Sequence, residues 1–217
     1  MRTDLIRKAA LTAAGLAFTG GAIAGPVTAA HAAPTTDTKP AAATQDRKNG
    51  EKELGVRYEA QPNFYYCGPA ATRNALSVQG KDINVDAMAK QMGTTEAGTD
   101  SINDITPVLN KETGKNAYRS VEIATPNADD KQTDTLRTDV RKAVDDGRAV
   151  VANIAGTATD TDGGVHSFEG GHYISVVGYR DNGDTVKIAD SANPAQASYW
   201  ITTEALADWI ATRGYAA

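Results

Sequence analysis

The chain has 217 residues, of which 41% are hydrophobic and 23% charged, so it can form a packed core in one or at most two domains. Its 22 basic and 27 acidic side chains give a net charge of −5 without a basic run, which argues against binding to nucleic acid or to an anionic membrane. One cysteine and three histidines exclude an internal disulfide, a CxxC redox pair and a multi-cysteine zinc site.

Residues 1–32 have the pattern of a secretory signal peptide. A basic start and an apolar stretch rich in alanine and glycine precede Ala30-His31-Ala32, which fits the small-x-small cleavage pattern. A membrane anchor is the alternative, but the stretch is only weakly apolar. Because the segment lacks adjacent arginines, we expect export by the general secretory route to the extracellular space, and no stable membrane association after cleavage.

Residues 33–54 are polar and lack apolar periodicity, so we interpret them as a disordered linker or a short pro-segment before a domain at 55–217. In that domain 156–171 is polar and rich in glycine, which predicts a loop. Helical spacing and capping residues predict helices at 68–80, 84–93, 101–109, 136–147 and 206–210, and apolar runs predict strands at 148–155, 174–180, 186–189 and 198–201. Helices followed by an antiparallel sheet indicate an α+β fold.

The lone cysteine, Cys67, stands at the start of the first predicted helix. A thiolate there would meet unpaired backbone N–H groups and the positive end of the helix dipole, both of which stabilise it. A buried structural cysteine is the alternative, since free thiols are commonly buried. A single cysteine in an exported protein favours the reactive thiol, which then needs a base.

His172, at the entry to an apolar strand, is the candidate base, and Gly170-Gly171 before it permits close approach of another group. His166 is the rival, but a base in a flexible loop is poorly held, so we assign it to the loop with at most a gating or substrate role. A third residue should orient the imidazole. Asp190, at the end of the next strand, is the first candidate and Asn193 the second.

The turn between these two strands decides which candidate shares a face with His172. A two-residue turn at Asn182-Gly183 would place Asn193 opposite His172, whereas a three-residue loop starting at Asp181 would place Asp190 diagonally from it. Because glycine adopts the left-handed conformation without strain, we predict the three-residue loop with Gly183 in a bulge, and therefore Asp190 as the orienting residue.

Gln61 precedes the cysteine and can donate a side-chain N–H to a developing oxyanion, with the backbone N–H of Cys67 as the second donor. The set Gln61, Cys67-Gly68-Pro69-Ala70, Gly171-His172-Tyr173 and Asp190 resembles the papain-like cysteine peptidases of the double-glycine (bacteriocin leader) peptidase family, and most closely their secreted stand-alone relatives. In this chain Ser191 follows Asp190 where relatives often have proline, and Tyr65-Tyr66 replaces the acidic residue common before the cysteine.

The resemblance implies an α+β fold in which the cysteine-bearing helix packs on the antiparallel sheet that bears the histidine. It also implies that Cys67 is the nucleophile, His172 the general base and acid, Asp190 the orienting residue and Gln61 the oxyanion donor. Such a site hydrolyses a peptide bond through a thioester and needs neither a metal nor an organic cofactor. We expect a monomer that acts on a peptide or protein substrate.

Three functions are compatible with these residues. The first is a secreted cysteine peptidase. The second is a thiol acyl-transfer enzyme or cell-wall peptide hydrolase on the same fold, and the third is a catalytically silent binding module. Specificity depends on pocket shape, so the sequence alone names no substrate.

Overall fold

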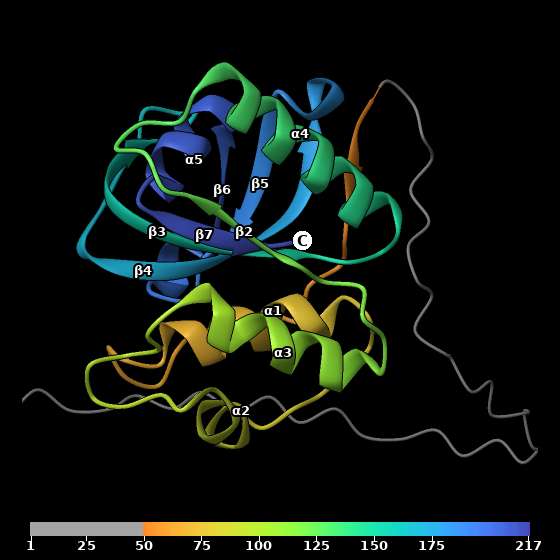
Figure 1. Cartoon of the computed structure of the whole chain (residues 1–217), viewed down its shortest axis with the longest axis vertical. Helices are drawn as coiled ribbons and strands as arrows, with labels where there is room; N and C mark the ends of the chain where they lie inside the picture. The colour runs from red at the N-terminus through yellow and green to blue at the C-terminus, as the bar shows by residue number, and fades with distance from the viewer. Residues whose placement is uncertain (1–49) are drawn as a thin grey trace, which may run out of the picture. The chain divides into compact units, whose positions relative to one another are not determined.

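The computed structural model describes residues 50–217, and Figure 1 shows helices packed on both sides of a twisted sheet. The predicted signal peptide and most of the predicted linker, up to residue 49, lie outside the described residues. Mixed helices and an antiparallel sheet confirm the α+β class.

Local sequence signals explain where the helices begin and end. Asn84 and Ser101 cap the second and third helices, and Gly93 and Gly114 end them in the left-handed conformation. The third helix is longer than predicted because Pro107 is tolerated inside it, where the freed carbonyl of Asn103 lies on the exposed side. The helices are α1 (Cys67–Ser77), α2 (Val85–Met92), α3 (Ile102–Thr113), α4 (Asp130–Asp145) and α5 (Thr203–Ile210).

The sheet is antiparallel, and its strands follow the order β2-β7-β3-β4-β5-β6, with β1 pairing separately to β4. At Tyr179, β5 pairs with one edge of β4. The pairing of β3 with the other edge ends at Val150, and β1 pairs with the part of that edge that β3 leaves free. The strands are β1 (Lys52–Glu53), β2 (Ser120–Ile123), β3 (Val150–Thr159), β4 (Val165–Arg180), β5 (Thr185–Ala189), β6 (Ser198–Thr202) and β7 (Arg213–Ala216).

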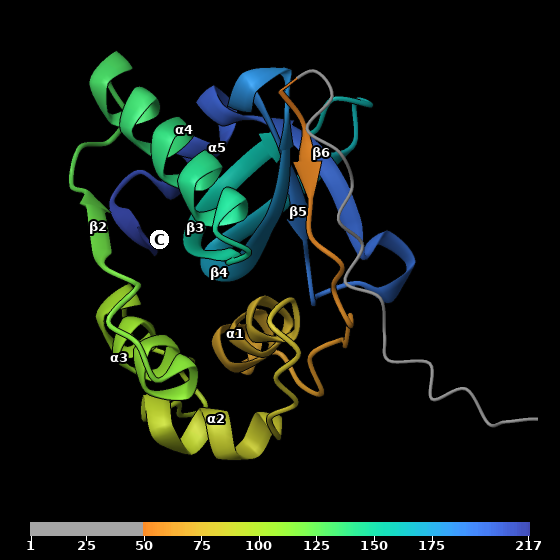
Figure 2. The ribbon, with the colours of Figure 1, turned by 90° about the vertical axis from the view of Figure 1, so that its right-hand side faces the viewer.

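Alternate residues of the central strands face two separate cores. On β3, Val150 and Ala152 pack with α4 and α5, whereas Val151 packs with the helices α1, α2 and α3. Figure 2 shows the same division, with α4 and α5 on one side of the sheet and α1, α2 and α3 on the other. Because both faces are covered, the central strands form continuous apolar runs, which is why the sequence predicted them correctly.

The prediction of a loop at 156–171 is wrong. Strands β3 and β4 extend as a hairpin through most of this segment, and only residues 160–164 form the turn. Buried and exposed side chains alternate in the first part of β4, but a buried position is occupied by His166, which a sequence pattern counts as polar. The short strands β1, β2 and β7 were not predicted, and β1 shows that residues 50–54 belong to the folded domain and not to the linker.

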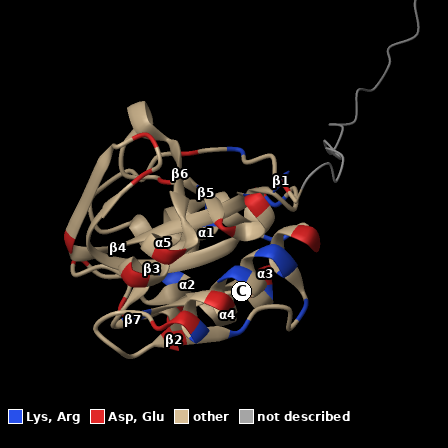
Figure 3. Cartoon of the chain, turned by 90° about the horizontal axis from the view of Figure 1, so that it is seen from above, with Lys and Arg blue, Asp and Glu red and all other residues tan. Residues whose placement is uncertain are grey.

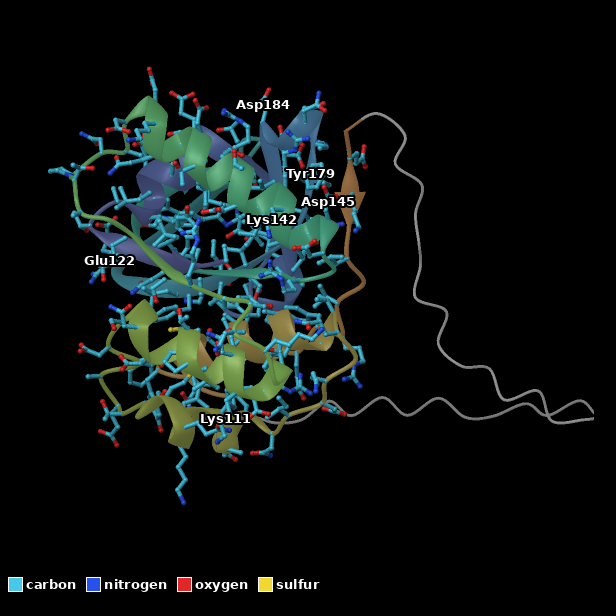
Figure 4. The ribbon with its side chains drawn as sticks, turned by 45° about the vertical axis from the view of Figure 1, so that its right-hand side comes forward. Lys111, Glu122, Lys142, Asp145, Tyr179 and Asp184 are labelled. Carbon is cyan, nitrogen blue, oxygen red and sulfur yellow. The ribbon has the colours of Figure 1, made fainter. Side chains whose placement is uncertain are left out.

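The outer face of α4 carries charges of both signs, and Figure 3 shows acidic and basic residues interleaved along it. Helix α4 is also tied to the sheet. Tyr179 of β4 points to Asp145 in Figure 4, and the Tyr179 hydroxyl donates to the Asp145 carboxylate over 2.9 Å.

Within residues 50–217 we find no helix whose length and apolar character would let it cross a membrane.

Candidate active site

Cys67 is the first residue of α1, and its side chain is 8% exposed. The other four described α-helices each have a side-chain cap at the N-terminus, but α1 has none. Its first backbone N–H groups therefore remain available beside the sulfur. Gly68 allows a close approach there, since a Cβ on it would lie 2.5 Å from the Thr99 hydroxyl.

Helix α1 packs directly against the strand that carries the histidine. The Ser175 hydroxyl of β4 donates to the Ala71 carbonyl of α1 over 2.6 Å, deep in the interior. On the same strand, His172 is 4% exposed, and its Nε2 is hydrogen-bonded to Asp190 Oδ1 over 2.8 Å. Nδ1 is therefore the nitrogen left for the Cys67 thiol, with which the ring also interacts.

The electrostatics of this group favour a charged imidazole. Burial alone would lower the pKa of His172, but the hydrogen bonds to Asp190 and Cys67 and their negative charges outweigh it and raise the pKa to about 9. Burial likewise opposes the charge on Asp190, yet the hydrogen bond and charge of His172 lower the pKa of that carboxyl below its ordinary value. At neutral pH His172 is therefore protonated.

The strand register brings Asp190 to His172, although the turn differs from the one predicted. Four residues, 181–184, separate the paired Arg180 and Thr185, so the prediction of a three-residue loop is wrong. The register shifts by one residue between Val176 and Gly178, where β4 contains a bulge. Beyond the bulge, Ser175 pairs with Ala189. Continuing this register by one residue places Ile174 opposite Asp190. Asp190 therefore lies diagonally from His172, on the same face of the sheet.

Asn193 takes no part in this contact. Its side chain is exposed and accepts the backbone N–H of Ala195 over 3.0 Å, capping the short 3₁₀ turn Pro194–Gln196. Asp190, by contrast, is 3% exposed and also accepts the backbone N–H of Ala192 over 2.9 Å. Of the two candidates, only Asp190 contacts the imidazole.

Gln61 is held beside the residue that follows Asp190. Its backbone N–H donates to the Ser191 carbonyl over 3.0 Å, and its side-chain oxygen accepts the Ser191 hydroxyl over 3.1 Å. One side-chain N–H donates to the Asn63 carbonyl over 2.9 Å, so the second N–H is the one left for an oxyanion. The contact explains Ser191, because proline at this position would have no hydroxyl for Gln61.

Two aromatic residues also contact the site, and one of them, Tyr199, was missed by the sequence analysis. The Phe168 ring stacks on the His172 ring with centroids 4.1 Å apart, and the Tyr199 hydroxyl donates to Asp190 Oδ2 over 3.0 Å. Tyr199 lies on β6, two residues beyond the partner of Asp190, and only the pairing of β5 with β6 brings it there. The assignment of His166 to a flexible loop is wrong, because this residue is buried in β4.

A pocket of about 340 Å³ lies next to these residues. It is lined by residues of four segments, namely Asp100, Ser101 and Ile102, Glu122 and Ala124, Asn153, and Thr212, Arg213 and Gly214. Arg213 borders Gly171, the neighbour of His172, since its Nη2 is 3.5 Å from where a Cβ of that glycine would lie. Cys67, His172 and Asp190 do not line the pocket themselves, so Gly171 is its link to the thiol–imidazole pair.

A cysteine on the first turn of a helix, facing a histidine and an aspartate on an antiparallel sheet, is the arrangement of a papain-like cysteine peptidase. More specifically, the chain belongs to the Peptidase_C39-like family, whose model matches residues 53–217. This confirms the resemblance drawn from the sequence.

Two solved structures are similar to the chain at low identity, and the first of them shares its fold. A putative C39-like peptidase from Bacillus anthracis is 12% identical, with a TM-score of 0.51 and coverage of 76% of this chain and 96% of that one. The peptidase domain of Streptococcus ComA, a bifunctional ABC transporter of a quorum-sensing pathway, is 15% identical, with a TM-score of 0.48 and coverage of 76% and 95%. No curated protein matches the chain.

Proposed function

We propose that the protein is an exported cysteine peptidase that hydrolyses peptide bonds through Cys67, His172 and Asp190. The observation that carries the proposal is the buried line of thiol, imidazole and carboxylate, in which Asp190 binds Nε2 and leaves Nδ1 for the sulfur. A base held by a third group and facing a thiol is the requirement for nucleophilic catalysis by cysteine.

The imidazole is protonated at neutral pH, because the pKa of His172 is raised to about 9, and we propose that the Cys67 sulfur beside it reacts as the thiolate. The Cys67 sulfur attacks the carbonyl carbon, and the oxyanion receives N–H groups from the uncapped start of α1 and from Gln61. His172 protonates the leaving amine, then takes a proton from water, which hydrolyses the thioester. Asp190 holds the ring in one orientation throughout.

The substrate class we propose is a peptide or protein met outside the cell by a monomeric enzyme. Membership of a peptidase family supports the peptide bond as the reacting group, and the pocket beside Gly171 offers room for a substrate chain. Export rests on the signal pattern of residues 1–32, with cleavage before Ala33. Mass spectrometry of the mature secreted protein tests that boundary.

Incubation of the purified protein with a mixed peptide library, with cleavage read by mass spectrometry, tests the proposal. We expect new termini with wild type and none with Cys67→Ala, which keeps the fold because only one small side chain is shortened. Acyl transfer to an added amine without net hydrolysis would instead identify a transferase. Binding of peptides without any cleavage would identify a silent module.

A further inference from the structure

The histidine that the proposed mechanism leaves unused is also buried and paired. The His166 Nε2 lies 2.9 Å from Asp160 Oδ2, and these side chains are 5% and 6% exposed. Within residues 50–217, both histidines are thus buried and bonded through Nε2 to an aspartate. Burying a polar pair costs hydration, so a second such pair close to the first calls for a role.

The second pair reaches the first through Tyr199. The His166 ring stacks on the Tyr199 ring, with centroids 3.8 Å apart and planes 19° from parallel. The Tyr199 hydroxyl in turn donates to Asp190 Oδ2, and Asp190 Oδ1 binds His172. A continuous set of contacts therefore runs from the β3–β4 turn to the proposed catalytic imidazole.

The surrounding structure fixes this set in place. Asp160 also accepts the backbone N–H groups of Asp162 and Gly164 over 2.9 and 2.7 Å, so its carboxylate shapes the turn. The turn is tied to β6 next to Tyr199, because the Thr161 N–H donates to the Trp200 carbonyl over 2.8 Å. The position of the Tyr199 ring is thereby set from two sides.

We propose that Tyr199 is a positioning residue for the Asp190 carboxylate, and that the buried pair of His166 and Asp160 holds the Tyr199 ring in that position. The inference rests on the proposed function, since it assigns Asp190 a role in orienting His172. The hydroxyl satisfies Oδ2 and so leaves Oδ1 directed at the imidazole N–H. Without it, a buried carboxylate oxygen loses its donor, and the carboxylate turns toward other donors.

The first test compares Tyr199→Phe with a matched control, Tyr215→Phe. Tyr215 is fully buried on β7 and donates to Asp139 Oδ2 over 2.8 Å, so the control removes the same kind of bond away from the site. We expect Tyr199→Phe to lower kcat about tenfold, the low end of the value of a hydrogen bond to a charged group, with KM within about twofold. Tyr215→Phe should leave both unchanged.

The pH profile separates positioning from simple loss of stability. Besides His172, the titratable groups near Asp190 are Tyr199 and Tyr58, and Asp160 lies near Tyr199. Since the Tyr199 hydroxyl lowers the pKa of Asp190, Tyr199→Phe should move the acid limb of kcat/KM to higher pH, and Tyr215→Phe should not. Equal changes in the two variants would overturn the proposal.

A double-mutant cycle tests the part assigned to His166. His166→Ala should lower kcat about fivefold in wild type but have almost no further effect in Tyr199→Phe, because it acts only through that hydroxyl. His166→Phe, which keeps a ring on Tyr199, should recover most of the loss. A full effect of His166→Ala in the Tyr199→Phe background would overturn the proposed coupling.

Alkylation separates this inference from the proposed function. If wild type cleaves no peptide, the proposed function fails, but the rate at which iodoacetamide modifies Cys67 at pH 6 still reports the thiol–imidazole pair. We expect that rate to fall severalfold in Tyr199→Phe and to stay unchanged in Tyr215→Phe. Equal rates in both variants would show that Tyr199 does not position the triad.

Discussion

The charge on His172 should make an unusually large contribution to stability below neutral pH. Its pKa rises from 6.5 to about 9 on folding, which corresponds to about 3 kcal/mol when the imidazole is protonated in both states. Because the folded-state pKa is the higher one, this contribution is fully present below pH 6.5. It is lost as the pH rises through about 9.

His172→Gln isolates this contribution, since glutamine keeps an N–H donor for Asp190 but carries no charge. Urea unfolding of both proteins at pH 6 and pH 9.5 gives four free energies of unfolding. From pH 6 to pH 9.5 the free energy of unfolding of wild type should fall by about 3 kcal/mol more than that of the variant. Every other titrating group is present in both proteins, so the difference reports His172 and its partners.

A wild-type protein that loses no more stability than His172→Gln over this range would refute the reasoning. The ring would then be neutral at pH 6, and burial would have outweighed Asp190 and Cys67. A larger loss in the variant would mean that the imidazolium is destabilised in the folded state. In either case the reaction could not start from an ion pair.

Three further outcomes test the site. Alkylation of Cys67 by iodoacetamide should slow less than threefold from pH 8 to pH 6. Over the same range, alkylation of a thiol with the ordinary pKa of about 8.5 slows about eightyfold, and His172→Gln should restore this steep pH dependence. Asp190→Ala should lower kcat at least about a hundredfold and Asn193→Ala less than about twofold; equal losses would reject Asp190 as the orienting residue. Gln61→Ala should lower kcat about a hundred- to a thousandfold with the alkylation rate nearly unchanged, whereas Ser191→Ala, which keeps the amide, should cost about tenfold.

The sequence predicted those parts of the molecule that depend on neighbouring residues. Cys67 at a helix start and His172 at the entry to an apolar strand are both visible in a few consecutive positions. Tyr199 is not, because its contact with Asp190 depends on how β5 pairs with β6. The same holds for β1, two residues whose strand character comes wholly from pairing with β4.

The prediction of the turn shows how local reasoning can reach the right contact by a wrong route. The conformational preferences of Asp181, Asn182 and Gly183 do lead to a tight left-handed turn, with φ of 54°, 55° and 93°. They do not specify the bulge in β4. The one-residue shift in strand pairing that was expected at the turn occurs instead at this bulge. Gly178 at this bulge lies against β1, since a Cβ there would be 2.9 Å from the Lys52 carbonyl oxygen. The strand register that places the Asp190 carboxylate beside His172 therefore depends on tertiary contacts and not on the turn sequence alone.

The tether between Gln61 and Ser191 joins positions 130 residues apart, and His172 likewise comes from the far end of the domain. A ribosome makes the proposed nucleophile, Cys67, early, and it makes the proposed base His172, its partner Asp190 and the Ser191 that holds Gln61 late. During synthesis the cysteine therefore exists for most of the time as a plain thiol on an unfinished domain. In the proposed mechanism, Cys67 gains its base and the carboxylate that orients this base only when β4 and β5 have joined the sheet.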